Sequence, residues 1–369
     1  MQGQSRRIFL AGAVPGALAA QSRPEDQVRT AMIGVGNRGG YLLTNVLAEK
    51  RAKVGAICDI KPDRLDKGAT AAARDKPKTA TDYRRVLEMR DIDAVFIATP
   101  CDLHPEMSTA ALQAGKHVYC EKPLGITPDS VREMLRVVGR SKPVFMVGLQ
   151  RHSDNGLRQL IEKIHGGAVG KPVFIKAQRH SAVDYSPTGS SGDWIFDAKR
   201  SGDVIVEQSI HNLDVCNWVL QHHPEKASGF RGTLVSPNSP PGRTTTDAYC
   251  VNFEYPGGLM MSFTQLAFHP AEMPAGGEQT WVYGADGSVV LETGMAYPRD
   301  QRKPFVLEQR NRENREAIHI AKFYDCILHG TKPETGVALG AEATLTAILG
   351  RESMFKGKVL DWKELGVAL

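Results

Sequence analysis

Between Val28 and Gly148, short apolar runs alternate with segments of helical periodicity. The apolar runs are VRTAMIG, VGAICDI, DAVFIATP, HVYCEKP and KPVFMVG, and each predicts a buried strand. The intervening segments, such as RGGYLLTNVLAEK and TPDSVREMLRVVG, repeat apolar residues at the spacing of an amphipathic helix. Strands that alternate with helices form parallel sheets, so this half of the chain predicts a doubly wound α/β domain over residues 28–148.

The regular alternation of predicted strands and helices ends after Gly148. A helical segment, DNGLRQLIEKIHGG, precedes a strand pattern, VGKPVFIKAQRHS, and a helix is expected from about Val204 to Leu220. Two hairpin patterns follow, DAYCVNFEYPGGLMMSFTQ and TWVYGADGSVVLE, and two helical patterns close the chain. We therefore expect a second, α+β domain over residues 149–369 with a large, open and mostly antiparallel sheet.

Composition and charge narrow the class of protein. A chain of 369 residues is too long for one small core. The formal net charge is +5, or +3 without Arg6 and Arg7, and no block of like charges argues for nucleic acid. No apolar run reaches the roughly 18 residues of a membrane span. Six scattered cysteines show neither a C-x-x-C pair nor metal-type spacing, so we expect no metal site.

The N-terminal stretch SRRIFLAGAVPGALAA resembles a twin-arginine export signal. The match runs from Ser5 to Leu10, and Ala17-Leu18-Ala19 offers a cleavage site. We expect a signal over residues 1–20, a polar linker over residues 21–27, and a periplasmic or secreted protein. The alternative is the helical tail of a cytoplasmic protein.

GVGNRG places Gly34, Gly36 and Gly39 in the G-x-G-x-x-G spacing, between an expected strand and an expected helix. Glycines let the backbone approach a pyrophosphate, which the N–H groups of a helix N-terminus can bind. Asn37 and Arg38 complete the loop and are assigned to the same cofactor site. A plain strand-turn-helix without a ligand is the alternative.

Asp59 ends the next strand, 20 residues after Gly39. Its carboxylate can accept hydrogen bonds from the adenosine ribose and would repel a 2′-phosphate, which favours NAD over NADP. Lys61 and Arg64 are near enough in the sequence to soften that preference. Asp59 could instead cap the helix that starts near Pro62.

Three residues lie at or just after the end of the stretch DAVFIATP, where the carboxyl ends of parallel strands face the ligand crevice. Thr99 and Pro100 are expected to shape the floor under the cofactor. His104 is either a nicotinamide-side contact or a residue that starts the next helix.

The combination GVGNRG, ATPCDLHPEMSTAALQAGKHVYCEKPLG and GDVIVEQSIHNLD resembles the glucose-fructose oxidoreductase and inositol dehydrogenase family (Gfo/Idh/MocA). The resemblance covers nearly the whole chain from about Val28, including the late segment FYDCILHGTKPETGVALGAEATLTAILGRESMFKGK. It implies an N-terminal Rossmann domain, a C-terminal α/β domain with a large open sheet, and a substrate site between them.

In that family, the E-K-P lysine reaches both the nicotinamide ribose and the reacting hydroxyl, and a D-x-x-x-H pair completes the site. Lys122 matches the lysine, and Glu121 beside it is placed in the cofactor site. The pair is Glu207 and His211 here, so the carboxylate is one methylene longer than in the family. Residues four apart share a helix face, although an ordinary surface pair has the same spacing.

Oxidation of a secondary alcohol by hydride transfer requires a base for the hydroxyl proton. We expect His211 to be that base, because an imidazole titrates near neutrality. Lys122 would position and polarise the substrate oxygen. Glu207 would orient His211 or form a hydrogen bond within the site. Lys122 could itself be the base if desolvation or a positive neighbour lowered its pKa.

Other polar residues are candidates for substrate contacts. Gln150 and Arg151 follow the strand KPVFMVG at the domain junction, where a solvated turn is the alternative. Arg179 and His180, near the end of the strand pattern VGKPVFIKAQRHS, could line the pocket. Tyr185 and Trp194, in or beside a Ser/Gly-rich loop, could line it too, and an indole face suits stacking on a sugar ring. Each could equally be a packing residue.

These observations predict an NAD-dependent oxidoreductase that acts on a hydroxyl of a sugar, glycoside or cyclitol. The first alternative is a glycosidase that oxidises, eliminates and reduces with tightly bound NAD, since free NAD is scarce outside the cytoplasm. The second is a non-catalytic sugar or dinucleotide sensor. An open sheet face needs covering, so we expect a homodimer or homotetramer, with neither nucleic acid nor membrane insertion.

Overall fold

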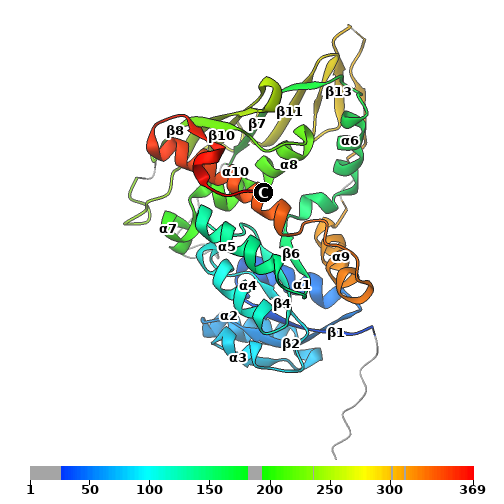
Figure 1. The fold of residues 1–369 in the computed structure, drawn as a ribbon, viewed down its shortest axis with the longest axis vertical. Helices are drawn as coiled ribbons and strands as arrows, with labels where there is room; N and C mark the ends of the chain where they lie inside the picture. Colours follow the sequence, from blue (N-terminus) through cyan, green and yellow to red (C-terminus); the bar gives the residue numbers. More distant parts are fainter. Residues whose placement is uncertain (1–25, 182–192, 236, 301, 311–312) are drawn as a thin grey trace, which may run out of the picture.

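The computed structural model describes residues 26–181, 193–235, 237–300, 302–310 and 313–369. Over these residues the chain forms a six-stranded sheet and a nine-stranded sheet, which occupy the lower and upper parts of Figure 1. The export signal expected over residues 1–20 and the predicted substrate contact Tyr185 lie outside the described residues.

The six-stranded sheet is parallel and has the strand order β3-β2-β1-β4-β5-β6. Its strands are β1 (Val28–Ile33), β2 (Ala52–Cys58), β3 (Lys78–Ala80), β4 (Ala94–Ile97), β5 (His117–Glu121) and β6 (Phe145–Gly148). This is the order of a Rossmann fold, as predicted. The five predicted strands are almost entirely buried, as expected for a sheet covered on both faces. β3 has no apolar run because it is a short and largely exposed edge strand.

Five helices alternate with these strands: α1 (Asn37–Ala48), α2 (Pro62–Ala71), α3 (Tyr83–Leu87), α4 (His104–Gln113) and α5 (Pro128–Gly139). α5 illustrates why they form. Thr127 and Ser130 exchange side-chain and backbone hydrogen bonds in a capping box, which satisfies two N–H groups at the helix start. Val131, Met134 and Val137 then recur at helical spacing and bury one face of the helix.

A helix from the far end of the chain, α9 (Arg315–His329), packs beside α1 on the Rossmann sheet (Figure 1). Its Phe323 and Tyr324 join the aromatic cluster of Phe96 and Tyr119, whose rings stack with centroids 4.7 Å apart. The Tyr324 hydroxyl also lies 2.8 Å from the hydroxyl of Thr30 on β1. The late helix therefore completes the core of the first sheet.

The nine-stranded sheet has the order β14-β13-β12-β11-β7-β10-β9-β8-β15 and is antiparallel except between β7 and β10. Its strands are β7 (Pro172–His180), β8 (Lys226–Gly232), β9 (Ala248–Tyr255), β10 (Leu259–Leu266), β11 (Gly277–Gly284), β12 (Gly287–Val290), β13 (Met295–Pro298), β14 (Phe305–Val306) and β15 (Leu360–Asp361). Both predicted hairpins are confirmed, as β9–β10 and β11–β12.

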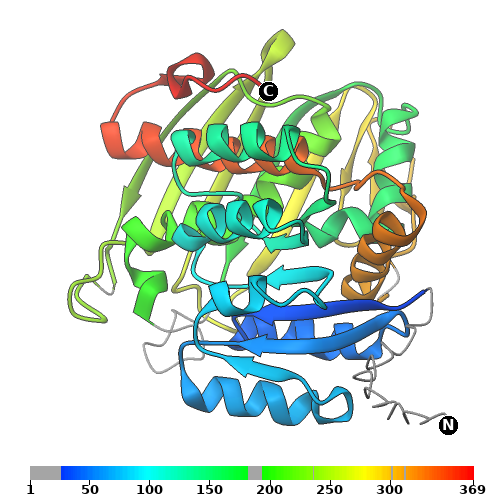
Figure 2. The ribbon, with the colours of Figure 1, turned by 60° about the horizontal axis from the view of Figure 1, so that its bottom comes forward.

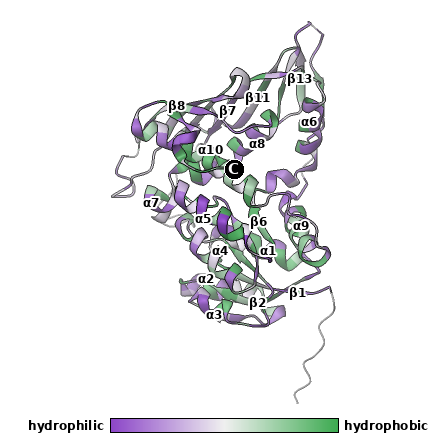
Figure 3. Cartoon of the chain, in the orientation of Figure 1, coloured by the Kyte–Doolittle hydropathy of each residue, from purple (hydrophilic) through white to green (hydrophobic). Residues whose placement is uncertain are grey.

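Two helices, α8 (Ile210–Leu220) and α10 (Val337–Lys356), pack on one face of the nine-stranded sheet, and α6 (Asn155–His165) packs beside α8. Figure 2 shows α10 lying between α5 and that sheet. Hydrophobic colour prevails around α10 in Figure 3, whereas α5 and α6 show hydrophilic turns on their outer sides. α10 thus packs against both α5 of the first domain and the nine-stranded sheet of the second. No helix in the described part of the chain is long and apolar enough to cross a membrane.

Candidate active site

A cavity of about 870 Å³ lies where the loops of the Rossmann sheet face the second sheet and its helices. From the predicted cofactor residues, its wall includes Gly34, Gly36, Asn37, Arg38, Asp59, Thr99, Pro100, His104, Glu121 and Lys122. From the predicted catalytic and substrate residues, it includes Gln150, Trp194, Glu207 and His211. Gly39 and Arg151 are not part of the wall. One cavity therefore brings together most of the predicted site.

The glycine-rich loop fits a dinucleotide. Gly34 has φ +82°, and a Cβ atom there would lie 2.6 Å from the carbonyl oxygen of Ala98. A Cβ atom at Gly39 would lie only 1.9 Å from the carbonyl oxygen of Gly34, so α1 starts in direct contact with the loop. Gly36 caps α1 without a side-chain acceptor, and the first turn contains no acidic residue. The N–H groups there remain available for an anionic pyrophosphate.

Asp59 is buried beside this loop. One carboxylate oxygen accepts the N–H of Val35 and the other accepts the N–H of Lys61, each at 2.9 Å. The N-terminal cap of α2 is Lys61, so Asp59 braces the glycine loop instead of capping that helix. The Arg64 guanidinium approaches the same loop, since a Cβ atom at Gly36 would lie 2.9 Å from its Nη1. The Asp59 carboxylate and the Arg64 guanidinium therefore both lie near the glycine loop, where an adenosine ribose would bind.

His104 begins α4 and is buried. Its Nδ1 lies 2.8 Å from the carbonyl oxygen of Pro123, and its Nε2 lies 3.0 Å from that of Thr99. A carbonyl oxygen only accepts, so both ring nitrogens must carry protons. Burial alone would lower the pKa of His104, but Cys120 and the two carbonyl groups outweigh it and raise the pKa to about 9. The ring thus ties the loop after β4 to the loop after β5, and neither nitrogen is free for a nicotinamide.

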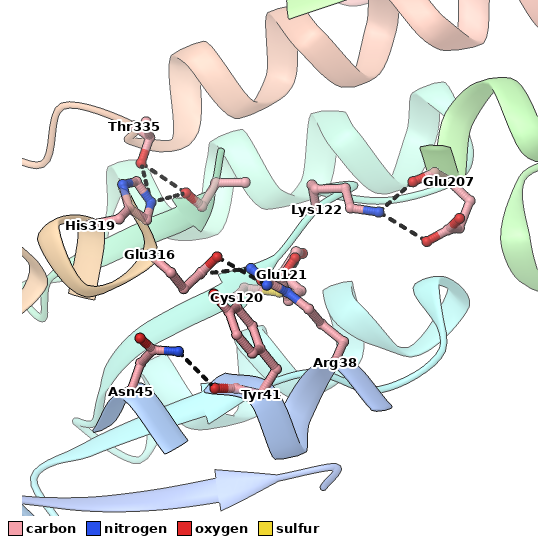
Figure 4. Close-up of polar contacts among 11 residues, drawn as sticks. Arg38, Tyr41, Asn45, Cys120, Glu121, Lys122, Glu207, Glu316, His319 and Thr335 are labelled. Atoms are coloured by element: carbon pink, nitrogen blue, oxygen red, sulfur yellow. Dashed lines mark hydrogen bonds and ion pairs between the residues drawn. The ribbon is translucent and has the colours of Figure 1, made fainter. Parts of the chain in front are cut away.

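Lys122 follows β5 and reaches across the cavity to the second part of the molecule. Its ammonium nitrogen lies 2.9 Å from Oε1 of Glu207 and also donates to the backbone carbonyl of Glu207 (Figure 4). Both side chains are largely shielded, with exposed fractions of 12% for Lys122 and 17% for Glu207. The carboxylate predicted to belong with His211 therefore contacts the lysine.

The expected helix from Val204 to Leu220 is two elements. Residues Ile205–Ser209 form a π turn, and α8 continues from Ile210. Asp203 starts the segment with φ 72°, and its Oδ1 accepts the N–H groups of Val204 at 2.6 Å and Thr246 at 3.0 Å. π turns often occur at functional sites because they displace side chains from the regular helical positions. This one carries Glu207 at its centre.

His211 lines the cavity, and its Nδ1 is buried without a hydrogen-bond partner among the described residues. Burial lowers the pKa of His211 well below its ordinary value, and the cationic groups of Lys122, Arg151, Arg38 and Arg179 lower it further. The imidazole is neutral at pH 7 and able to accept a proton.

Arg38 turns away from the glycine loop toward two buried carboxylates (Figure 4). Its Nε donates to Glu121 at 2.8 Å, and its terminal nitrogens donate to the two oxygens of Glu316 at 2.7 and 3.0 Å. Burial and the nearby Glu121 raise the pKa of Glu316, while Arg38 opposes that rise. Glu121 and Glu316 together therefore hold the Arg38 guanidinium in place. No sequence pattern pointed to Glu316, because it comes from the distant helix α9.

The remaining predicted contacts divide between the cavity and the structure behind it. Gln150 and Trp194 line the cavity. Arg151 lies behind the wall, where its guanidinium pairs with Glu278 of β11, so a direct substrate contact by Arg151 is not supported. Arg179, which was also a candidate for the pocket, lines the cavity and pairs with the same carboxylate.

Two family models match this chain. The model described as an oxidoreductase family with an NAD-binding Rossmann fold matches residues 28–149, and the GFO/IDH/MocA C-terminal domain model matches residues 157–290. The chain belongs to the Gfo/Idh/MocA family of oxidoreductases, which carry an NAD-binding Rossmann fold.

Curated relatives are distant. The uncharacterized oxidoreductase YrbE of Bacillus subtilis is 25% identical over 84% of this chain and 88% of its own length. The 1,5-anhydro-D-fructose reductase of Ensifer adhaerens is 26% identical over 81% of this chain and 91% of its own length. The myo-inositol 2-dehydrogenase of Thermotoga maritima is 26% identical over 56% of this chain and 59% of its own length.

Solved structures share the fold. Levoglucosan dehydrogenase in complex with NADH and L-sorbose superposes with a TM-score of 0.79 and 19% identity, over 92% of this chain and 100% of that one. The myo-inositol 2-dehydrogenase of Lactobacillus plantarum gives a TM-score of 0.76 and 22% identity, over 91% of this chain and 99% of that one.

Proposed function

We propose that the chain is an NAD-dependent oxidoreductase that moves a hydride between nicotinamide and a secondary hydroxyl of a sugar, glycoside or cyclitol. The contact between Lys122 and Glu207 carries this proposal, because it holds an ammonium group at the carboxyl edge of the dinucleotide-binding sheet, in one cavity with His211. The names of the relatives, which specify anhydrofructose and inositol as substrates, support a polyhydroxylated substrate.

The residues that would hold the cofactor are those of the glycine loop and Asp59. The free N–H groups at the start of α1 suit a pyrophosphate, and the fixed carboxylate of Asp59 favours an unphosphorylated adenosine ribose, and so NAD over NADP. When bound, nicotinamide accepts or gives the hydride.

The chain's own residues would handle the substrate oxygen and its proton. Lys122, kept in place by Glu207, binds the oxygen as a cation and stabilises negative charge that develops on it. His211 is neutral at pH 7 and receives the hydroxyl proton on its imidazole ring. In the reverse direction the same imidazole returns the proton.

A redox glycosidase is the second candidate, and one observation favours it. Glu207 contacts Lys122 and not His211, so the cavity holds two acid-base groups that are not hydrogen-bonded to each other among the described residues. A cycle of oxidation, elimination and reduction needs one proton acceptor for a hydroxyl and another for the adjacent C–H bond. Such a cycle gives net hydrolysis without consuming NAD.

Export through a twin-arginine signal and assembly into a dimer or tetramer also remain proposals. Phe230, Met260 and Tyr283 expose apolar surface on strands of the nine-stranded sheet, which supports an assembly that covers them.

The experiment begins with protein purified without added cofactor, from which any bound dinucleotide is released and identified. The protein is then incubated with NAD and a panel of sugars, glycosides and cyclitols. Stoichiometric NADH formation with a panel member supports the dehydrogenase. Release of an aglycone without net NADH supports the glycosidase. Absence of both reactions across the panel, with NADH bound, contradicts the catalytic proposals.

A further inference from the structure

Two residues outside the proposed catalytic group meet at the cavity wall. Arg179 comes from β7, and Gln208 comes from the π turn, next to Glu207. The Nε of Arg179 donates to Oε1 of Gln208 at 3.3 Å, and its Nη1 donates to Glu278. Both residues line the cavity. They therefore lie close to the atoms proposed for catalysis without being part of them.

The orientation of the Gln208 amide follows from its partners. An arginine only donates hydrogen bonds, so the atom that faces Arg179 must be the amide oxygen. The same oxygen accepts from Nε2 of Gln265 at 3.1 Å. The amide nitrogen of Gln208 is consequently left as a donor, buried and without an acceptor among the described residues. A buried donor of this kind requires a partner, and a ligand in the cavity can supply one.

Arg179 has donor capacity left as well. Among the described residues its Nη2 makes no hydrogen bond, and its side chain is 28% exposed while lining the cavity. Its charge is also incompletely balanced, because Arg151 and Arg179 share the single carboxylate of Glu278. Glu292 is near Arg151, but burial raises the pKa of Glu292, which weakens it as a counterion. This part of the wall therefore carries surplus positive charge.

We propose, on the basis of the function proposed above, that the substrate is an acidic sugar or cyclitol whose carboxylate binds Arg179 and Gln208. An ionised carboxylate only accepts hydrogen bonds, which matches a wall that offers donors. Its negative charge offsets the surplus positive charge of the guanidinium groups of Arg151 and Arg179. Hydrogen bonds between charged groups are also stronger than those between neutral groups. Arg179 and Gln208 line the same cavity as Lys122, so one ligand can present its carboxylate to the first two and its hydroxyl to the lysine.

The test compares matched pairs of neutral and acidic ligands on the NADH-loaded protein, such as D-glucose with D-glucuronate and D-galactose with D-galacturonate. Titration calorimetry measures binding and needs no turnover. In at least one pair the acid is expected to bind tighter by about tenfold or more, the range of one hydrogen bond to a charged group. Arg179→Met should abolish that preference.

Arg200→Met is the matched control. Arg200 also lines the cavity, but Asp102 balances its charge one to one at 3.3 Å, so its loss should affect both members of a pair alike. Gln208→Leu is the second variant, for use if thermal unfolding shows that Arg179→Met does not fold. It should weaken the acid more than the neutral sugar.

Equal or tighter binding of the neutral member in every pair would overturn the proposal, as would an Arg179→Met variant that weakens both members equally. The outcome is separable from that of the proposed function. If the acidic ligands bind more tightly in a way that depends on Arg179, but no NADH forms, the carboxylate subsite is supported and the dehydrogenase proposal is rejected. If NADH forms from neutral sugars in preference to acidic ones, the dehydrogenase proposal is supported and the carboxylate subsite is rejected.

Discussion

The ammonium nitrogen of Lys122 lies 2.9 Å from Oε1 of Glu207, and the two residues come from opposite sides of the cavity. Lys122 follows a strand of the Rossmann sheet, whereas Glu207 belongs to the π turn in front of α8. The contact fixes the ammonium group where a dinucleotide and a substrate would meet. It also leaves His211 without the carboxylate partner that its sequence spacing suggested.

Glu207→Gln tests whether the charge of this contact matters. Glutamine keeps the length of the side chain but removes the counterion of Lys122, so we expect kcat to fall by about ten- to a hundredfold while NADH binding is retained. Glu207→Asp keeps the charge at a shorter reach and should give an intermediate value. Glu162→Gln on the exposed face of α6 is the control. Equal kcat values for Glu207→Gln and the unmodified chain would contradict a role for the ion pair.

The pH dependence tests His211 as the base. A base acts in its unprotonated form, and burial together with nearby cations lowers the pKa of His211 below its ordinary value of 6.5. Activity should therefore persist through neutral pH, and kcat/KM should decline only as the pH falls below that value. Arg151→Met removes one of these cations at a position that does not itself line the cavity, so the acidic limb should move toward neutral pH. An acidic limb at the same pH in both proteins would argue against His211.

Gly39 and Gly40 form a matched pair for the glycine loop. A Cβ atom at Gly39 would lie 1.9 Å from a backbone oxygen, whereas at Gly40 the nearest atom would be 3.7 Å away. Gly39→Ala should lower the melting temperature and abolish NADH binding. Gly40→Ala should keep both, with a gain of about 0.5–1 kcal/mol from the helical preference of alanine. Thermal unfolding and NADH fluorescence titration check this, and similar behaviour of the two variants would refute the close approach.

Asp59 is predicted to select the cofactor. Asp59→Asn removes the negative charge beside the expected ribose, so the affinity for NADPH should rise relative to that for NADH, by about tenfold. Asp63→Asn, in the exposed first turn of α2, is the control. Fluorescence titration with both dinucleotides gives the ratio. A ratio that does not change with Asp59→Asn would show that another group makes the selection.

Much of the fold could be predicted because its buried strands and amphipathic helices have clear patterns. β1, β2, β4, β5 and β6 appear as apolar runs since the sheet is covered on both faces. Edge strands such as β14 and β15 have two residues each and no pattern to detect. The helical pattern of α9 was visible, but the pattern alone does not say that the helix packs on the first sheet.

The site was predictable where a local motif carries it and not where distant segments meet. The glycine loop, Asp59 and Lys122 stand at fixed offsets from strands. The contact of Lys122 with Glu207 joins residues 85 positions apart, and the π turn shifts Glu207 from the helical position assumed for it. Glu278 and Glu316 come from segments without any motif, so only the folded chain reveals them.

Lys122→Met provides the most direct test of the central claim that Lys122 binds the reacting oxygen. Methionine preserves the shape of the side chain without its charge, and Lys171→Met at an exposed position is the control. With a substrate found in the panel, NADH formation by Lys122→Met should fall by about 10²- to 10⁴-fold while NADH still binds. An unchanged rate of NADH formation in the Lys122→Met variant would contradict the account.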